Sequence, residues 1–298
     1  MGVLYYRTID FSITGNPFMK IVYVDGNYIP LDQAVIPVDD LAVLRGYAAW
    51  DIIRTYDGKP YFLDDHLDRL RGSAERIGLD LPLTCDEIKA VVLSVLEKNP
   101  GTDEANIRVL VTGGSSPDYF TPSGRSRLVV LLTDIPKLPR EWYRDGVKVI
   151  THKAERAMPD AKVTDYVQAA LALKKAKARG GVEAVYVNRH NQALEATTSN
   201  LFAYIRDELV TPDHGVLKGI TRKTVLALAR ERMKVSERAL SLPDLLTAGE
   251  VFITGTNKGV VPVVQIDESV IGDGKPGPVT RELMQALDAQ AVKFRQAH

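Results

Sequence analysis

Residues 161–166 read Ala-Lys-Val-Thr-Asp-Tyr, and this stretch decides how the rest of the chain is interpreted. Lys162 has a short side chain on either side and a phenol four residues later, at Tyr166. A lysine in a low-dielectric site, or beside another cation, loses its proton more readily and can then form an imine with a carbonyl compound. Most lysines are solvated surface charges. Lys162 therefore becomes a candidate for this chemistry only in combination with motifs elsewhere in the chain.

Length and composition narrow the class of protein. The chain has 298 residues, enough for two domains of medium size. Lys and Arg total 38, as do Asp and Glu, so no net charge attracts nucleic acid or an anionic membrane, and neither is an expected partner. The single cysteine, Cys85, excludes an internal disulfide and fits a reducing compartment. No apolar run approaches the roughly 20 residues of a membrane span. We expect a cytoplasmic protein with no metal site.

The first half of the chain predicts a small α/β domain. Residues 1–18 are interpreted as an extension. Two hairpins with glycine turns follow, and then helices, strands and a long loop rich in Gly, Ser and Pro. On the first of these helices His66 and Arg69 fall on the polar flank, and a solvated position is favoured for His66. The expected elements are strands 21–24 and 28–31, strands 49–56 and 59–62, helix 63–77, helix 86–98, strands 106–112 and 128–133, and loop 113–126.

A linker is predicted at residues 135–146, which places a small domain at 19–134 and a large one at 147–298. The large domain opens with a strand at 147–151, and a helix follows Lys162 and ends at Gly180-Gly181. The segment 194–202 is unusual because a carboxylate, Glu195, enters a strand region and is followed by small hydroxyl side chains. On sequence alone, Glu195 is equally well interpreted as an exposed strand residue.

Two turns in the large domain suit an anion. Gly219-Ile220-Thr221 precedes a helix predicted at 223–233, with a hydroxyl at the cap position that frees backbone amides toward a ligand. Thr254-Gly255-Thr256 ends a predicted strand in a similar way. Together they fit a phosphate group held from two sides, and neither resembles the Walker or dinucleotide fingerprints. An amphipathic helix is predicted at 279–297.

In their order and spacing, these pieces resemble the class IV (fold type IV) pyridoxal-phosphate aminotransferases, which include branched-chain and D-amino-acid aminotransferases and aminodeoxychorismate lyase. The resemblance runs from about residue 21 to the end of the chain. It implies an α+β fold in which the larger, C-terminal domain has a β-barrel-like core flanked by helices. The motifs that match are Val24-Asp25-Gly26, Arg45-Gly46-Tyr47, His66-Leu67-Asp68-Arg69-Leu70, Ala161-Lys162, Leu194-Glu195, Ser199-Asn200-Leu201-Phe202, Gly219-Ile220-Thr221-Arg222 and Thr254-Gly255-Thr256.

The resemblance also implies a role for each matching residue. Lys162 corresponds to the lysine that forms the aldimine with pyridoxal 5′-phosphate and moves the substrate Cα proton. Glu195 corresponds to the partner of the pyridine nitrogen, and Tyr166 to a phenol near the ring oxygen. Leu217 corresponds to an apolar residue against one ring face. The remaining cofactor contacts are Arg69, Ile220, Thr221 and Thr256 at the phosphate, with Thr198 and Ser199 beside them. The implied reaction moves an amino group between an amino acid and a 2-oxo acid by a ping-pong mechanism.

Substrate choice is less closely defined. Arg108 matches an arginine of the branched-chain enzymes, and Thr256 and Asn257 lie at the expected substrate side. Those enzymes commonly have a tyrosine where Arg45 stands, and an arginine there can hold a carboxylate bidentately, as in a minority group that uses D-amino acids. The alternative is a structural Arg45 that pairs with Asp39 or Asp40.

Three functions stay open on this basis. The first is a transaminase acting on branched-chain L-amino acids or on D-amino acids. The second is a lyase acting on aminodeoxychorismate with the same lysine and cofactor. The third is a binding protein that kept the fold without catalysis. The resemblance also implies a homodimer with a shared active site, to which the loop 113–126 and the Arg45 region are suitable donors.

Overall fold

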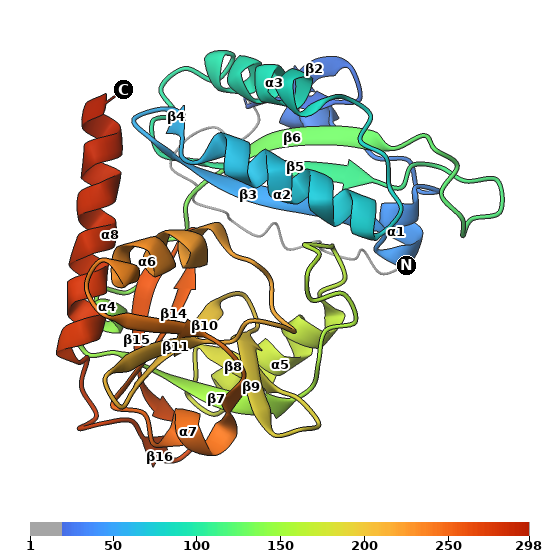
Figure 1. Cartoon of the computed structure of the whole chain (residues 1–298). Coiled ribbons are helices and arrows are strands. Elements are labelled where there is room, and N and C mark those ends of the chain that lie inside the picture. Colours follow the sequence, from blue (N-terminus) through green and yellow to red (C-terminus); the bar gives the residue numbers. More distant parts are fainter. Residues whose placement is uncertain (1–19, 298) are drawn as a thin grey trace, which may run out of the picture.

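The computed structural model describes residues 20–297, so the extension predicted at 1–18 lies outside the described residues. The chain forms two sheets, one above the other in Figure 1. The first is built from strands that end at Thr133, and the second begins at Val147. Mixed helix and sheet in this arrangement agree with the expected α+β fold. No helix in the described part of the chain is long and apolar enough to cross a membrane.

The first sheet has six strands, and all its pairings are antiparallel. It opens with a hairpin whose two turn residues, Asp25 and Gly26, have φ of 48° and 96°, as a tight hairpin turn of this length requires. In spatial order the strands are β2 (Asn27–Pro30), β1 (Ile21–Val24), β6 (Arg127–Thr133), β5 (Asn106–Thr112), β3 (Ala48–Tyr56) and β4 (Lys59–Pro60).

The second sheet has ten strands and curls into a half-barrel. Three of its pairings are parallel, β11 with β12, β15 with β7 and β7 with β8, and the others are antiparallel. In spatial order the strands are β12 (Lys234–Glu237), β11 (Glu208–Thr211), β10 (Asn200–Ile205), β14 (Glu250–Gly255), β15 (Gly259–Ile266), β7 (Val147–Lys153), β8 (Glu183–Val187), β9 (Gln192–Ala196) and β13 (Leu240–Ser241), with β16 (Ser269–Val270) paired to β15.

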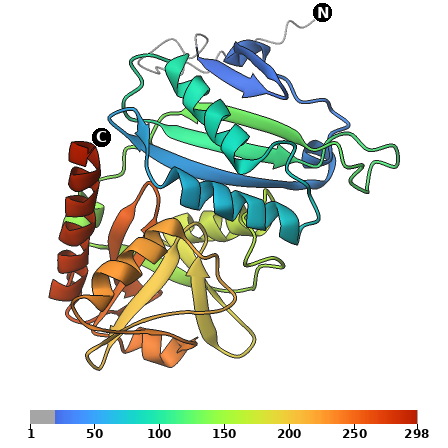
Figure 2. The same cartoon turned by 45° about the horizontal axis from the view of Figure 1, so that its top comes forward.

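Helices cover both sheets. Two pack on the first sheet and bury a core of aliphatic side chains from Ile88, Val92 and Ile107 among others. The C-terminal helix packs on β14 and β15 and continues upward beside the first sheet, as Figures 1 and 2 show. The helices are η2 (Leu31–Gln33), α1 (Leu41–Arg45), α2 (Leu63–Arg76), α3 (Cys85–Glu97), α4 (Glu141–Arg144), α5 (Val167–Ala178), α6 (Ile220–Arg230), α7 (Leu242–Leu246) and α8 (Pro278–Ala297).

Several predicted boundaries differ from the structure. The strand expected at 59–62 is only the two residues of β4, because Phe62 adopts a left-handed conformation (φ 54°) and becomes the N-cap of α2. Helix α6 begins three residues earlier than predicted, with Gly219 rather than a hydroxyl residue as its N-cap. The segment expected to be only a linker contains α4, which packs on β15.

Candidate active site

A cavity of about 380 Å³ lies between the two sheets, and side chains of both line it. It brings together most of the residues that the sequence motifs selected. Those residues are Arg69, Arg108, Lys162, Tyr166, Glu195, Thr198, Ser199, Leu217, Ile220, Thr221, Thr256 and Asn257. Of the predicted site residues, Arg45 does not line the cavity.

The backbone of Lys162 is fixed where the two sheets meet. Its N–H donates to Ser73 Oγ on α2 at 3.0 Å, and its carbonyl oxygen accepts from the N–H of Trp50 on β3 at 2.9 Å. Two residues after Lys162, Thr164 N–H donates to the carbonyl oxygen of Ala48, which is also on β3, at 3.1 Å. The segment from the second half of the chain is thus hydrogen-bonded to the edge of β3, and this fixes the origin of the Lys162 side chain.

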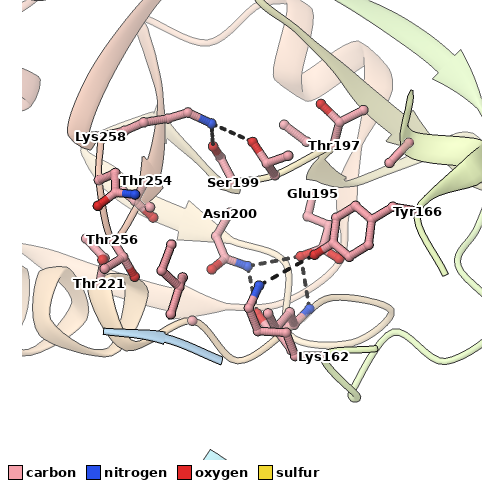
Figure 3. Close-up of a pocket in the computed structure, with 18 of the residues that line it drawn as sticks. Lys162, Tyr166, Glu195, Thr197, Ser199, Asn200, Thr221, Thr254, Thr256 and Lys258 are labelled. Carbon is pink, nitrogen blue, oxygen red and sulfur yellow. Dashed lines mark hydrogen bonds between the residues drawn. The ribbon is translucent and has the colours of Figure 1, made fainter. Parts of the chain in front are cut away.

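The amine of Lys162 faces the cavity and is buried near another cation, Arg69. Nζ lies 3.5 Å from the hydroxyl of Tyr166 (Figure 3). It also lies 3.9 Å from the centre of the Trp50 ring. Burial lowers the pKa of Lys162 to about 7, and the nearby guanidinium of Arg69 adds to this effect. Near neutral pH a large fraction of Lys162 is therefore the free amine, which is the form that attacks a carbonyl.

Glu195 is buried on β9, so the exposed-strand interpretation of this residue was wrong. Its Oε1 accepts from Arg156 at 2.9 Å, and its Oε2 accepts from Asn200 Nδ2 at 3.3 Å and from Leu217 N–H at 3.0 Å. Burial raises the pKa of Glu195, and the charge of Arg156 opposes that rise. The carboxylate is held in one orientation and still lines the cavity (Figure 3). It is suited to accept a hydrogen bond from a protonated ring nitrogen.

Arg69 reaches the cavity from α2 as one member of a buried cluster. Asp51 on β3 accepts from Arg69 Nε at 2.8 Å and from Nη2 at 2.7 Å, and from His66 Nδ1 at 2.8 Å. His66 is 2% exposed, so its predicted solvated position was wrong. Burial acts to raise the pKa of Asp51, but Arg69 and His66 outweigh it and hold that pKa well below the usual range. Asp51 therefore fixes Arg69 as a cation at the cavity wall.

The beginning of α6 lies beside Arg69, whose Nη1 is 3.5 Å from the carbonyl oxygen of Lys218, and it is suited to bind an anion. The first amides of a helix have no partners within the helix, and Gly219 as N-cap supplies no side chain to occupy them. A Cβ on Gly219 would lie 2.1 Å from Asn200 Oδ1, so a larger residue there would force the Asn200 side chain to move. Ile220, Thr221 and Thr256 line the cavity beside these amides. With Arg69, this set fits the phosphate of pyridoxal phosphate.

Two polar atoms of the same wall have no partner. Thr254 Oγ1 and Asn257 Oδ1 are buried without a hydrogen bond to any residue in the range 20–297. Buried polar groups are normally paired, so unpaired ones at a cavity wall indicate a polar ligand or water. This agrees with a cofactor and substrate that bind at this end of the cavity.

At the cavity wall, a lysine connects two turns. Lys258 Nζ donates to Ser199 Oγ at 3.0 Å (Figure 3). It also binds Thr198 Oγ1 and the carboxylate of Glu183. Glu183 in turn accepts from Thr198 N–H at 2.7 Å and from Ser199 Oγ at 2.6 Å. The turn after β9 and the turn after β14 are thereby held in fixed positions relative to each other.

The side of the cavity beyond Lys162 is largely apolar. Trp50, Ile52, Pro136 and Leu138 line it, together with one guanidinium, that of Arg108, which lies 5.5 Å from the centre of the Trp50 ring. Arg45 lies elsewhere, exposed on α1, with its guanidinium 5.6 Å from the centre of the Phe120 ring.

The alternative proposed for Arg45, an ion pair with Asp39 or Asp40, is not formed. Asp40 instead caps α1 through Ala42 N–H and contacts Thr112 and Arg127, while Asp39 accepts from Ser115.

Several residues of the site were missed by the sequence motifs. Asp51 lies on the buried face of β3, whose residues alternate between buried and half-buried. A buried carboxylate needs a charged partner, so an acid at this strand position could have been chosen as a candidate site residue. Arg156 and Lys258 belong to loops with no local pattern, and only tertiary contacts identify them. The missed residues are Trp50, Asp51, Ser73, Arg156, Glu183 and Lys258.

Comparison with known proteins agrees with this site. Residues 48–266 match the family model for class IV aminotransferases. The chain is 35% identical over 284 residues to a putative branched-chain-amino-acid aminotransferase of Methanocaldococcus jannaschii, covering 93% of this chain and 98% of that protein. It is 31% identical over 276 residues to a D-alanine aminotransferase of Bacillus licheniformis, covering 90% of this chain and 96% of that protein.

Solved structures agree with the sequence comparison. A branched-chain amino acid aminotransferase of Escherichia coli superimposes with a TM-score of 0.85 at 26% identity, covering 91% of this chain and 94% of that one. Another branched-chain amino acid aminotransferase, solved with pyridoxamine 5′-phosphate, superimposes with a TM-score of 0.84 at 28% identity, covering 93% and 95%.

The chain belongs to the class IV aminotransferase family. It is a pyridoxal-phosphate-dependent aminotransferase with the fold type IV architecture, and the prediction of family, fold and cofactor made from the sequence is confirmed.

Proposed function

We propose that the protein transfers the amino group of branched-chain aliphatic L-amino acids to a 2-oxo acid. The observation that supports this choice is the cavity wall beyond Lys162, where Trp50, Ile52 and Leu138 offer an apolar surface and Arg108 offers a single cation. Burying an aliphatic side chain against the apolar surface makes the free energy of binding more favourable. A guanidinium binds the substrate carboxylate strongly. The relative in Methanocaldococcus jannaschii and the Escherichia coli enzyme, both named for branched-chain amino acids, support the same choice.

In this proposal each residue has one task. Bound pyridoxal phosphate supplies an electron sink for the electrons released at the substrate Cα. Lys162 would hold the cofactor at its aldehyde carbon and would accept the substrate Cα proton, for which a pKa of about 7 is well matched. Glu195 would keep the ring nitrogen protonated, and Tyr166 lies beside the lysine amine. Arg69, Ile220, Thr221 and Thr256 would hold the phosphate, Thr198 and Ser199 would contribute further cofactor contacts, and Leu217 would lie against the ring, since all of them line the cavity.

A half-reaction against a panel of amino acids tests the substrate proposal. The holoenzyme is mixed with each L- and D-amino acid without an acceptor, and loss of the cofactor's visible absorption is followed. We expect L-leucine, L-isoleucine and L-valine to react fastest, and the spectrum to recover when a 2-oxo acid is added, as ping-pong kinetics requires. A faster reaction with D-alanine would exclude our choice of substrate. Formation of pyruvate from aminodeoxychorismate without a second substrate would instead show the lyase.

We further propose that the active protein is a homodimer in the cytoplasm, with neither nucleic acid nor a membrane as partner. Exposed apolar side chains on α1 and on the loop after β5 support an interface at this surface: Val43 is 57% exposed, Tyr119 56% and Phe120 69%. Arg45 lies in the same surface, and in a dimer it would reach the substrate end of the neighbouring cavity. The balanced charge and the single cysteine support the location and the absence of those partners.

Mixing two inactive variants tests the shared site. Lys162→Ala removes the amine from its own cavity, and Arg45→Ala removes the guanidinium that its partner would use. If Arg45 serves the neighbouring cavity, a mixed dimer has one intact site, and unfolding and refolding the two variants together restores activity. If Arg45 acts within its own chain, mixing restores none. Full activity of Arg45→Ala alone would show that Arg45 has no substrate role.

A further inference from the structure

Arg156 lies in the loop between β7 and Lys162 and extends to Glu195. Its Nη1 donates to Glu195 Oε1 at 2.9 Å and to the Pro159 carbonyl oxygen at 3.1 Å. Its Nη2 donates to the carbonyl oxygen of Ala161, the residue just before Lys162, at 2.6 Å. The side chain is 20% exposed and lines the cavity. One guanidinium thus joins the lysine segment to the carboxylate on β9.

The buried charges of the site are paired in a way that leaves out Lys162. Asp51 is paired with Arg69, and Glu195 with Arg156. Within residues 20–297, Lys162 forms no ion pair with a carboxylate, and its amine instead contacts the Tyr166 hydroxyl and the Trp50 ring. A buried ammonium without a carboxylate partner is costly, so this pairing favours the neutral amine.

We propose that Arg156 is a positioning residue that serves as the counter-ion of Glu195, so that Lys162 has no carboxylate partner and releases its proton at neutral pH. After Arg156, Lys162 is the cation that acts most strongly on the buried Glu195 carboxylate, so without Arg156 it would compensate that charge and keep its proton. The charge of Arg156 also acts directly on the lysine amine and favours its neutral form. It lowers the pKa of Lys162, although less than burial and Arg69 do. The inference rests on the aminotransferase reaction but not on the substrate.

A purely structural role for Arg156 would depend on its hydrogen bonds to the carbonyl oxygens of Pro159 and Ala161. These bonds shape the loop and do not involve the Glu195 carboxylate. Lysine at position 156 keeps the charge but cannot make three bonds in this geometry, whereas glutamine keeps a donor and loses the charge. Arg156→Lys and Arg156→Gln therefore separate an electrostatic role from a structural one.

The experiment titrates the visible absorption of the bound cofactor in each holoenzyme from about pH 5 to about pH 10, which reports protonation of the Lys162 nitrogen where it joins the cofactor. We expect the midpoint of Arg156→Gln to rise by about one pH unit, because a positive neighbour has been removed. The midpoint of Arg156→Lys should stay close to that of the unaltered protein. Arg179→Gln, which removes a half-exposed arginine paired with Asp267, is the matched control and should change nothing.

An unchanged midpoint in Arg156→Gln, or equal shifts in the glutamine and lysine variants, would overturn the proposal. If the glutamine variant does not retain cofactor, the lysine variant decides: an unaltered midpoint there supports the electrostatic role, and loss of cofactor there refutes it. The titration uses no amino acid, so it can be distinguished from a test of the proposed function. A protein that transaminates no branched-chain amino acid would still give these midpoints.

Discussion

Asp51 holds Arg69 through two parallel hydrogen bonds, of 2.8 Å to Nε and 2.7 Å to Nη2, with the carboxylate completely buried. The two residues come from β3 and α2, so this ion pair also fixes the helix against the sheet. A guanidinium held in this way stays at the cavity wall, so binding an anion there orders it at little further entropic cost. The pair therefore links the stability of the first half of the chain to its readiness to bind a phosphate.

We expect Asp51→Asn to destabilise the protein by about 3 kcal/mol, because it leaves the buried Arg69 without a carboxylate. Bound cofactor should reduce the loss, since its phosphate gives Arg69 a new partner. Urea unfolding with and without pyridoxal phosphate measures both effects. Asp68→Asn on the same helix removes an exposed ion pair with Arg71 and should cost less than about 1 kcal/mol. Equal losses in the two variants would argue against a special role for Asp51.

Lys162→Ala should abolish transamination, because no other described residue places an amine beside Tyr166 in the cavity. The phosphate contacts remain, so the variant should still bind cofactor, but borohydride should no longer attach it to the protein. Mass spectrometry after reduction measures this. The exposed Lys174 on α5 provides the control, and Lys174→Ala should behave like the unaltered protein. Turnover at the normal rate in Lys162→Ala would refute the assignment.

The pH dependence of cofactor capture follows from the lowered pKa of Lys162. Burial brings that pKa from 10.5 to about 7, and only the free amine attacks the aldehyde. In cofactor-free protein, the rate of capture should therefore rise as the pH passes through about 7 and then level off. Stopped-flow absorbance measures it. A rate that keeps rising toward pH 10 would mean that the amine behaves like an exposed lysine.

Gly219→Ala tests the beginning of α6. The new Cβ would lie 2.1 Å from Asn200 Oδ1 and would displace the amide that holds Glu195. We expect a loss of stability of about 1 to 3 kcal/mol and weaker cofactor binding, measured by unfolding and by equilibrium dialysis. Gly249→Ala is the control, since its Cβ would make only an ordinary contact at 3.6 Å. Normal cofactor affinity in Gly219→Ala would show that this wall does not touch the cofactor.

Arg108→Gln should raise the Michaelis constant for amino acids by roughly tenfold or more, because a charged hydrogen bond to the substrate carboxylate is lost. Simple amines have no carboxylate, so their rates should change little. Steady-state kinetics on both substrate types in the same variant measures the difference. Equal effects on the two types would mean that Arg108 supports the cavity only by packing on Trp50.

The sequence by itself determined the elements and the family. Helical spacing in 63–77 and apolar strands at 106–112 and 128–133 predicted α2, β5 and β6 within one residue at each end, because periodicity and turn residues are local signals. The motif residues Lys162, Glu195, Thr221 and Thr256 were also found this way, since short motifs in a fixed order identify a family without any knowledge of contacts.

Only the tertiary structure decided how those residues are charged and held. His66 and Glu195 look like exposed polar residues in the sequence, yet both are buried, because their partners Asp51 and Arg156 are 15 and 39 residues away. The pKa of Lys162 likewise depends on burial and on Arg69, which lies on α2 and is 93 residues away in the sequence. Electrostatic effects depend on distance in space and on exclusion of water, and neither quantity is set by spacing along the chain.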